Sequence, residues 1–319
     1  MHTYIIQRIL LFIPTMFLVT VLVFAVMRLI PGDPALLLLM GESGEGKFTQ
    51  EQLAALQAKL GTDRSVWVQY GDWVWDMLRG DFGISMFYNT PISDDIGDKF
   101  PITLELTVLA ILLATVVAVP LGVFSAMKQD TWPDYIARVI AISGVALPTF
   151  WVGILIIYFL VRLFDWLPPL GYVNLWEDPG TNLKQLIFPA ITLGFFNLAF
   201  MARVTRSSML EVFREDYIRT ARSKGLAERA VIVRHALKNA LLPVVTVSGY
   251  EFGRLLAGTV VIETIFLVPG MGRLLIDSIF HRDYAMVQAI VMVIIAVVLV
   301  LNLLLDLVYA WLNPRIRFT

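Results

Sequence analysis

Residues 215–238 read EDYIRTARSKGLAERAVIVRHALK, and apolar runs flank this stretch: LIFPAITLGFFNLAFMA at 186–202 and NALLPVVTVSGY at 239–250. The segment from Arg203 to Lys238 holds nine Lys or Arg residues, out of 25 in the whole chain of 319 residues. A basic segment between two long apolar runs is typical of a cytoplasmic loop that joins two transmembrane helices. This pattern predicts an all-α integral membrane protein.

The composition agrees with that prediction. The chain is 58% hydrophobic and only 16% charged, with a mean hydropathy of +0.74, whereas soluble domains carry about 25% charged residues. It has no cysteine, which excludes disulfides and thiolate metal sites. The net charge of −1 provides no bulk attraction to nucleic acid, so we expect no nucleic-acid partner.

Six apolar runs are long enough to cross a bilayer, which takes about 20 residues. They lie at 9–27, 102–126, 139–164, 186–202, 241–268 and 284–312. The first run is longer than the core of a signal peptide, about 7–15 residues, so we expect it to be retained. The predicted organisation is an N-terminal transmembrane helix (1–30), an extracytoplasmic helical insertion (31–100) and a transmembrane core (101–319) with a cytoplasmic loop at 203–240.

The distribution of Lys and Arg predicts the orientation. With both termini inside, the inner segments carry fourteen basic residues and the short outer loops three, or five when Arg28 and Arg162 at the outer span ends are included. Short inner loops are enriched in Lys and Arg, while long loops cross largely regardless of their charge. We therefore expect cytoplasmic N- and C-termini and a cytoplasmic basic loop.

The outer insertion has helical patterns of its own. Thr49 and Gln52 in TQEQLAALQAKLG form a capping-box pattern, and Gly61 ends that run. A second amphipathic helix is expected from Val66 to Leu78. Its three tryptophans, Trp67, Trp73 and Trp75, suit either the membrane–water boundary or packing of the insertion, and both interpretations stay open.

Nucleotide, metal and enzyme sites are not indicated. GESGEGKF (41–48) resembles a phosphate-binding loop, but Phe48 stands where a Ser or Thr hydroxyl is needed, and the segment is expected outside. A flexible connector is the better interpretation. His2, His235 and His281 are far apart in the sequence, and no nucleophile is placed beside a base. We expect no enzymatic site.

The fifth span carries three charges. Glu251 and Arg254 are three residues apart and can pair on one helix face. Such charges cost about 2.5–3.5 kcal/mol each at mid-bilayer when they face lipid, so they are expected to line a water-filled path or to form a structural pair between helices. Glu263 is expected near the outer end, where solvation alone could suffice.

Three further features belong to the spans and their outer loop. The small residues Gly249, Gly253 and Ala257 favour close approach of another helix. Glu105 and Asp306 are expected to have buried partners rather than to contact a solute. The loop before the last span contains FLVPGMGRLLIDSIFHRDY (266–284), which predicts an amphipathic segment at the membrane face.

The basic loop has a pattern that topology alone does not require. The stretch from Glu215 to Lys224 predicts a short helix, with acidic residues at its start and a basic residue at its end. Gly225 permits a left-handed turn out of that helix. We expect a helix–Gly–helix elbow that docks on another protein, with apolar contacts from Tyr217, Ile218, Ala221 and Leu226 and polar contacts from the arginines. The alternative is a topology signal that binds anionic lipid headgroups.

The elbow resembles the cytoplasmic coupling loop of ABC-transporter permeases, in the branch that imports dipeptides, oligopeptides and nickel. Ala221, Gly225 and Leu237 match the general family loop, while Arg219 and Thr220 depart from its Glu-Ala, and YIRTARSKGL is typical of the peptide branch. Further segments agree along nearly the whole chain: IPGDP (30–34), GDFGIS (80–85), RSSMLEV (206–212), ETIFLVPGMGRLLIDSI (263–279) and NPRIR (313–317).

The resemblance implies a function and partners. The chain would be the first of two permease subunits, forming half of the pathway of an ATP-driven importer, with peptides as the expected cargo and nickel, glutathione or oligosaccharide as alternatives. A second permease, two cytoplasmic ATPases that bind ATP and magnesium, and an extracytoplasmic binding protein would complete it. The coupling residues would be Glu215, Asp216, Tyr217, Ile218, Arg219, Thr220, Ala221, Arg222, Lys224, Gly225 and Leu226.

The expected translocation-path residues are Glu251, Arg254 and Glu263. A secondary transporter working alone and a membrane enzyme are the rival functions. The first would show inverted repeats, and none is visible. The second needs a convergent catalytic group, which the sequence does not reveal.

Overall fold

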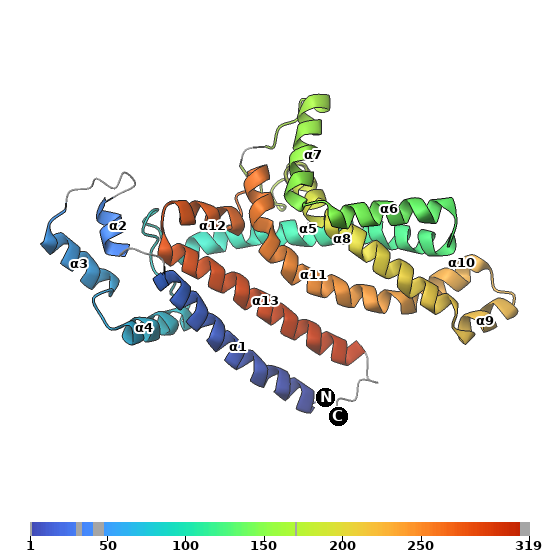
Figure 1. Cartoon of the computed structure of the whole chain (residues 1–319), viewed down its shortest axis with the longest axis horizontal. Coiled ribbons are helices and arrows are strands. Elements are labelled where there is room, and N and C mark those ends of the chain that lie inside the picture. Colours follow the sequence, from blue (N-terminus) through green and yellow to red (C-terminus); the bar gives the residue numbers. More distant parts are fainter. Residues whose placement is uncertain (1, 30–33, 41–47, 170, 313–319) are drawn as a thin grey trace. The chain divides into compact units, whose positions relative to one another are not determined.

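The computed structural model describes residues 2–29, 34–40, 48–169 and 171–312, and every regular element in that part of the chain is helical (Figure 1). The predicted all-α fold is therefore confirmed. The connector at 41–47 lies outside the described residues. The helices are α1 (His2–Leu29), α2 (Pro34–Met40), α3 (Gln50–Leu60), α4 (Val66–Leu78), α5 (Ile92–Met127), α6 (Trp132–Ala146), α7 (Thr149–Phe164), α8 (Pro179–Phe213), α9 (Asp216–Ser223), α10 (Glu228–Ala230), the π-helical turn η1 (Val231–Ala236), α11 (Leu237–Phe266), α12 (Met271–Phe280) and α13 (Tyr284–Leu312).

Five described helical segments are long and apolar enough to cross a membrane: 10–29, 92–127, 179–213, 228–266 and 284–307. A sixth candidate is the pair α6 and α7, which are bent by 106° at the break between them. The predicted third span, 139–164, is therefore not one straight helix, and the count reaches six only if this bent pair crosses as a single span.

The bend occurs at Leu147 and Pro148. Proline has no N–H to continue the helical hydrogen bonds, and it disfavours the helical conformation of the residue before it. Accordingly, Leu147 (φ −84°, ψ 130°) and Pro148 (φ −61°, ψ 132°) are both extended. The carbonyl of Pro148 then accepts the first hydrogen bonds of α7, which points away from α6 in Figure 1. An apolar run of 26 residues is thus divided by one proline.

The chain divides into two compact units. Among the described residues, unit 1 comprises 2–29, 34–40, 48–102 and 270–303, and unit 2 comprises 103–169, 171–269 and 304–312. In unit 1, α3 has the predicted capping box, since Gln52 N donates to Thr49 Oγ1 (3.2 Å) and Thr49 N to Gln52 Oε1 (2.9 Å). Gly61 follows α3 with a φ of +67°. The two helices expected between residues 49 and 78 are confirmed as α3 and α4.

The helix α4 packs on α1 through aromatic side chains. Phe24 of α1 contacts both Tyr70 and Trp73, with ring centroids 5.4 and 5.7 Å apart. The hydroxyls of Thr20 and Tyr70 share a hydrogen bond of 2.8 Å. Of the tryptophans whose role was left open, Trp73 therefore packs within unit 1, whereas Trp67 is 84% exposed.

The loop before the last span contains the expected amphipathic helix. This is α12, in which Leu274 is buried while Ile279 and Phe280 are exposed. Directly after it, the buried carboxylate of Asp283 accepts hydrogen bonds from Ser85 Oγ (2.5 Å) and Phe87 N (3.2 Å). These bonds join the GDFGIS segment to the start of α13.

In unit 2, α8 is the central helix. It contacts α6, α7 and α11, and 61% of its apolar window is buried. Close packing requires glycine at two points: a Cβ on Gly194 would lie 2.6 Å from the Ala110 carbonyl oxygen, and one on Gly122 would lie 2.6 Å from that of Ala202. At Gly249 a Cβ would lie 2.2 Å from Leu305 Cδ2, so the predicted close approach at this small residue is confirmed.

Candidate functional site

The basic loop forms the predicted elbow. Only Arg214 and Glu215 separate α9 from the end of α8. After α9 the chain turns at Gly225, whose φ is +75°, a left-handed conformation that glycine adopts without steric cost. It then continues through α10 and the π-helical turn η1 into α11. Helical turns of the π type are frequent at functional sites.

Hydrogen bonds hold the turn around Gly225. Gly225 N donates to the carbonyl of Arg222 (2.9 Å), and Leu226 N donates to that of Ala221 (3.4 Å). The Arg222 guanidinium donates to both carboxylate oxygens of Glu228, at 2.7 and 3.2 Å, and so bridges the two arms of the elbow. These bonds raise the pKa of Arg222 above its ordinary value.

One face of α9 packs into the chain itself, which corrects part of the sequence prediction. Ile218 is fully buried and Ala221 nearly so, in a cluster with Met209 of α8 and with Val231 and Ala236 of η1. Burial of a large aliphatic side chain stabilises such a contact by about 1.5–3 kcal/mol. Ile218 and Ala221 are therefore structural, and they are not available for the contact with another protein that the sequence predicted.

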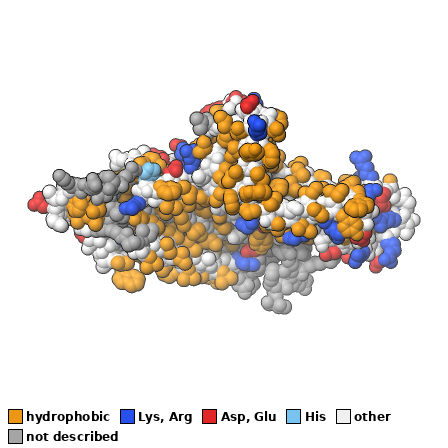
Figure 2. Space-filling view, turned by 45° about the horizontal axis from the view of Figure 1, so that its top comes forward, with side chains coloured by type: hydrophobic (Ala, Val, Ile, Leu, Met, Phe, Trp, Pro, Cys, Tyr) orange, Lys and Arg blue, Asp and Glu red, His pale blue; other side chains and the backbone are white. Residues whose placement is uncertain are grey.

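The opposite face of the elbow is exposed. This elbow surface includes Tyr217, Arg219 and Leu226, of which Tyr217 and Leu226 are 39% and 42% exposed. The Tyr217 hydroxyl accepts a hydrogen bond from Asn239 Nδ2 (2.7 Å), which fixes the ring against the start of α11. Figure 2 shows Lys and Arg side chains gathered on the right of the view, where α9 and α10 lie. The remaining exposed members are Glu215, Asp216, Thr220, Arg222, Lys224 and Gly225.

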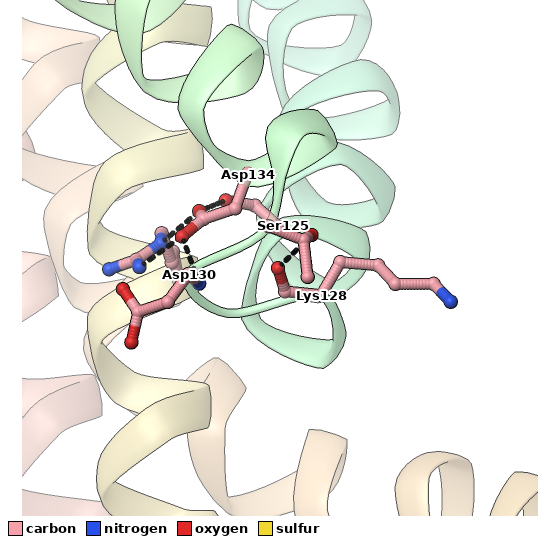
Figure 3. Close-up of polar contacts among 6 residues, drawn as sticks. Ser125, Lys128, Asp130 and Asp134 are labelled. Carbon is pink, nitrogen blue, oxygen red and sulfur yellow. Dashed lines mark hydrogen bonds and ion pairs between the residues drawn. The ribbon is translucent and has the colours of Figure 1, made fainter.

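A buried ion pair lies near the end of α8 that leads into the elbow. Figure 3 shows the polar contacts around its carboxylate, that of Asp134. The Asp134 side chain of α6 is fully buried, and its carboxylate accepts two hydrogen bonds of 2.7 Å from Arg206 of α8. It also accepts from Ser125 Oγ of α5 (2.5 Å) and from Asp130 N (3.0 Å). This Asp134–Arg206 clamp joins three helices at one point.

The clamp was not predicted from the sequence. Its two charges are 72 residues apart, and no periodicity relates positions on different helices. The one available signal was that Arg206 opens the RSSMLEV segment. In Figure 3 the Lys128 side chain points away from Asp134, so Arg206 supplies the cation.

The predicted pair in the fifth span is confirmed. Arg254 NH2 lies 2.5 Å from Glu251 Oε2, and the guanidinium lies 4.2 Å from the centre of the Phe196 ring. Arg254 borders a cavity of about 220 Å³ that Thr149 and Phe196 also line. Half of the Arg254 side chain is exposed within unit 2, and a charge on a membrane-spanning helix is expected to face protein or water rather than lipid.

The expectation for Glu263 was wrong. Its side chain is fully buried rather than solvated, and Oε1 accepts a hydrogen bond of 2.7 Å from Thr103 of α5. Glu105 has a protein partner as expected, but the contact is half-buried rather than buried: the Tyr172 hydroxyl donates to its carboxylate. The hydrogen bond from Thr103 thus replaces the solvation that was expected at Glu263. Among the described residues, no group of three or more His, Asp or Glu side chains could hold a metal ion.

Comparisons with known proteins agree over the full length. Residues 118–318 match the family described as "binding-protein-dependent transport system inner membrane component". Residues 1–107 match the family that describes the N-terminal part of such membrane components. The chain is 40% identical to a peptide transport system permease protein of Brucella abortus, over 100% of both chains. It is 41% identical to the dipeptide transport system permease protein DppB of Escherichia coli, over 99% of each. The corresponding DppB of Alkalihalophilus pseudofirmus is 38% identical over 100% of both.

The clamp makes a prediction for stability. Removing one partner of a buried ion pair costs about 3–5 kcal/mol, because the other charge stays buried without compensation. We expect Asp134→Asn and Arg206→Gln each to lower the thermal unfolding midpoint of the purified chain in detergent. The double variant should lose less unfolding free energy than the two single variants together, with a coupling energy of about 1–3 kcal/mol. Additive losses, or single variants that unfold like the wild type, would contradict the clamp.

Proposed function

Because the chain belongs to the family of binding-protein-dependent transport system inner membrane components, and is thus the permease subunit of an ABC importer, we propose that it carries peptides and that an ATPase docks on its elbow surface. It is a multi-pass protein of the inner membrane and is not itself an enzyme. Its family works with a partner permease, ATPases and a binding protein. Membership of this family sets aside the stand-alone secondary transporter.

The packing of α9 carries the proposal for the elbow. Ile218 and Ala221 attach α9 to α8 and η1, while Tyr217, Arg219 and Leu226 remain exposed on the other side. A force applied to the exposed side is therefore transmitted to two membrane helices, α8 and α11. The Arg222–Glu228 bridge and the turn at Gly225 restrain the two arms of the elbow from moving independently. Such a rigid element suits coupling to movements of an ATPase.

The assembly that we propose is a heterodimer of this chain with a second permease, two cytoplasmic ATPases that hold ATP and magnesium, and an extracytoplasmic binding protein. Within the chain, we propose that residues 31–100 form an outer insertion between the helix 1–30 and the core 101–319. The excess of basic residues in 203–240 supports placing that loop and both termini in the cytoplasm.

For the translocation path, we propose that Glu251 and Arg254 line it. Their charges compensate each other, which lowers the cost of holding them at membrane depth and leaves polar groups for a passing solute. Glu263, which was expected beside them in this role, is buried on Thr103. We therefore propose that Glu263 supports the contact between α5 and α11.

Peptides are the proposed cargo because the similar proteins of Brucella and Escherichia are named for peptide and dipeptide transport. Nickel, glutathione and oligosaccharide are the alternatives. Uptake of each labelled solute by cells that express the complete system distinguishes them. The peptide proposal would be refuted if the cells took up one of the alternative solutes but neither dipeptides nor oligopeptides.

Gly225 offers a test with a matched control. No atom lies within 4 Å of a Cβ added at this glycine, so a substitution there acts through its φ of +75° alone. A β-branched residue is strained in this conformation, whereas Asn tolerates it. We expect Gly225→Val to reduce peptide uptake at least tenfold at normal protein level in the membrane, and Gly225→Asn to retain most of it. Equal uptake by the two variants would contradict the coupling role of this turn.

The two faces of α9 predict opposite defects. Arg219→Glu reverses an exposed charge. Among the described residues its one ion pair is with Asp216 at 3.3 Å, and this pair is exposed and weak. We expect it to reduce ATPase co-purification at least tenfold without changing the thermal midpoint. Ile218→Asp, in contrast, buries a carboxylate without a partner and should lower the midpoint itself. Normal ATPase retention by Arg219→Glu would exclude this part of the elbow surface from the interface.

The proposed orientation can be tested directly because the chain has no cysteine. A single cysteine at Ser223, on the elbow, should react with an impermeant maleimide only after the membrane is opened. A single cysteine at Asn174, in the loop before α8, should react in intact cells once the reagent has access to the periplasmic side. The reverse pattern would overturn the proposed topology.

A further inference from the structure

A cavity of about 280 Å³ lies between α5, α6 and α8, beside the Asp134–Arg206 clamp. Its lining combines three arginines, Arg138, Arg203 and Arg206, with apolar side chains that include Leu121, Ala141 and Ile142. No Asp or Glu is among its lining residues. This basic cavity therefore has a cationic part and an apolar part.

Two of the three arginine charges are not neutralised by a carboxylate in the described part of the chain. Arg206 is paired with Asp134, but Arg138 and Arg203 form no ion pair there. Each of these two instead lies over an aromatic ring: Arg138 over Tyr135 at 4.6 Å and Arg203 over Phe200 at 5.2 Å. A ring face positions a guanidinium without cancelling its charge. The basic cavity thus attracts an anion.

The surroundings of the basic cavity are those of a membrane boundary. The outward face of α6 beside it is apolar, with Val139, Ile140 and Ile142 all more than half exposed. Trp132, at the first turn of α6, is 81% exposed, and tryptophan is enriched where a span meets the headgroup region. The same end of α8 leads into the basic elbow. An anion that binds here is expected to be attached to an acyl chain.

We propose that the basic cavity binds an anionic phospholipid, with its phosphate on Arg138 and Arg203 and an acyl chain along Ala141 and Ile142. Basic pockets between transmembrane helices on the cytoplasmic side are suited to acidic headgroups. The apolar wall favours a lipid over a free phosphate ion. A bound lipid contacts both α6 and α8 and so reinforces the clamp between them. This site is independent of peptide cargo and of the elbow surface.

The test uses the complete transporter complex in nanodiscs that contain equal amounts of phosphatidylglycerol and phosphatidylcholine. Native mass spectrometry after release from the nanodiscs measures the lipid that stays bound. Each basic residue near an anionic surface contributes about fivefold to binding, so Arg138→Gln with Arg203→Gln should weaken phosphatidylglycerol retention by about 25-fold. The matched control, Lys128→Gln with Lys238→Gln, removes two exposed charges outside the basic cavity and should retain the lipid as the wild type does.

Two further measurements keep the result decisive. In nanodiscs of pure phosphatidylcholine, both double variants should unfold at the wild-type temperature, which shows that lost lipid is not lost folding. Ile142→Trp should reduce phosphatidylglycerol retention, because the larger side chain narrows the cavity at its apolar wall without a change of charge. The proposal is overturned if the arginine variants retain phosphatidylglycerol normally, or if millimolar inorganic phosphate displaces the lipid completely. It is also overturned if the assembled wild-type complex retains no anionic lipid because the second permease covers the basic cavity.

Discussion

The arrangement of the helices that lead into the elbow depends on the fully buried carboxylate of Asp134. This carboxylate accepts hydrogen bonds from Arg206, from Ser125 and from the backbone of Asp130. An unpaired charge at such a place is costly, so the three helices that supply its partners must meet there. This meeting point lies within two helical turns of the end of α8. Because α8 is fixed to α5 and α6 at that end, the position of α9 relative to these helices is determined as well.

The elbow combines rigidity with an exposed surface. Its inner face is packed with aliphatic side chains, its turn requires a left-handed residue, and its arms are bridged by Arg222 and Glu228. A loop without these features would absorb a displacement by changing its own conformation. Here a displacement of α9 costs least free energy when α8 and α11 move with it. Separating α9 from these helices would expose Ile218 and its neighbours to water.

The basic residues of α6, α8 and the elbow have different roles that composition alone does not separate. Some are exposed on the elbow, one neutralises a buried carboxylate, and two lie over aromatic rings beside the basic cavity. Two charged side chains of the fifth span also have polar or aromatic partners at close range. Arg254 has both Glu251 and Phe196, and Glu263 has Thr103.

The sequence by itself determined the helical class, most spans, the capped helix α3, and the elbow with its turn at Gly225, because these depend on composition, on periodicity and on neighbours a few residues apart. It also determined the Glu251–Arg254 pair, whose members are one helical turn apart. Only the tertiary structure decided that Ile218 and Ala221 face inward, that Glu263 is buried, and that Pro148 bends a predicted span by 106°. The clamp between Asp134 and Arg206 likewise required the fold, since local patterns carry no information on which helices pack together.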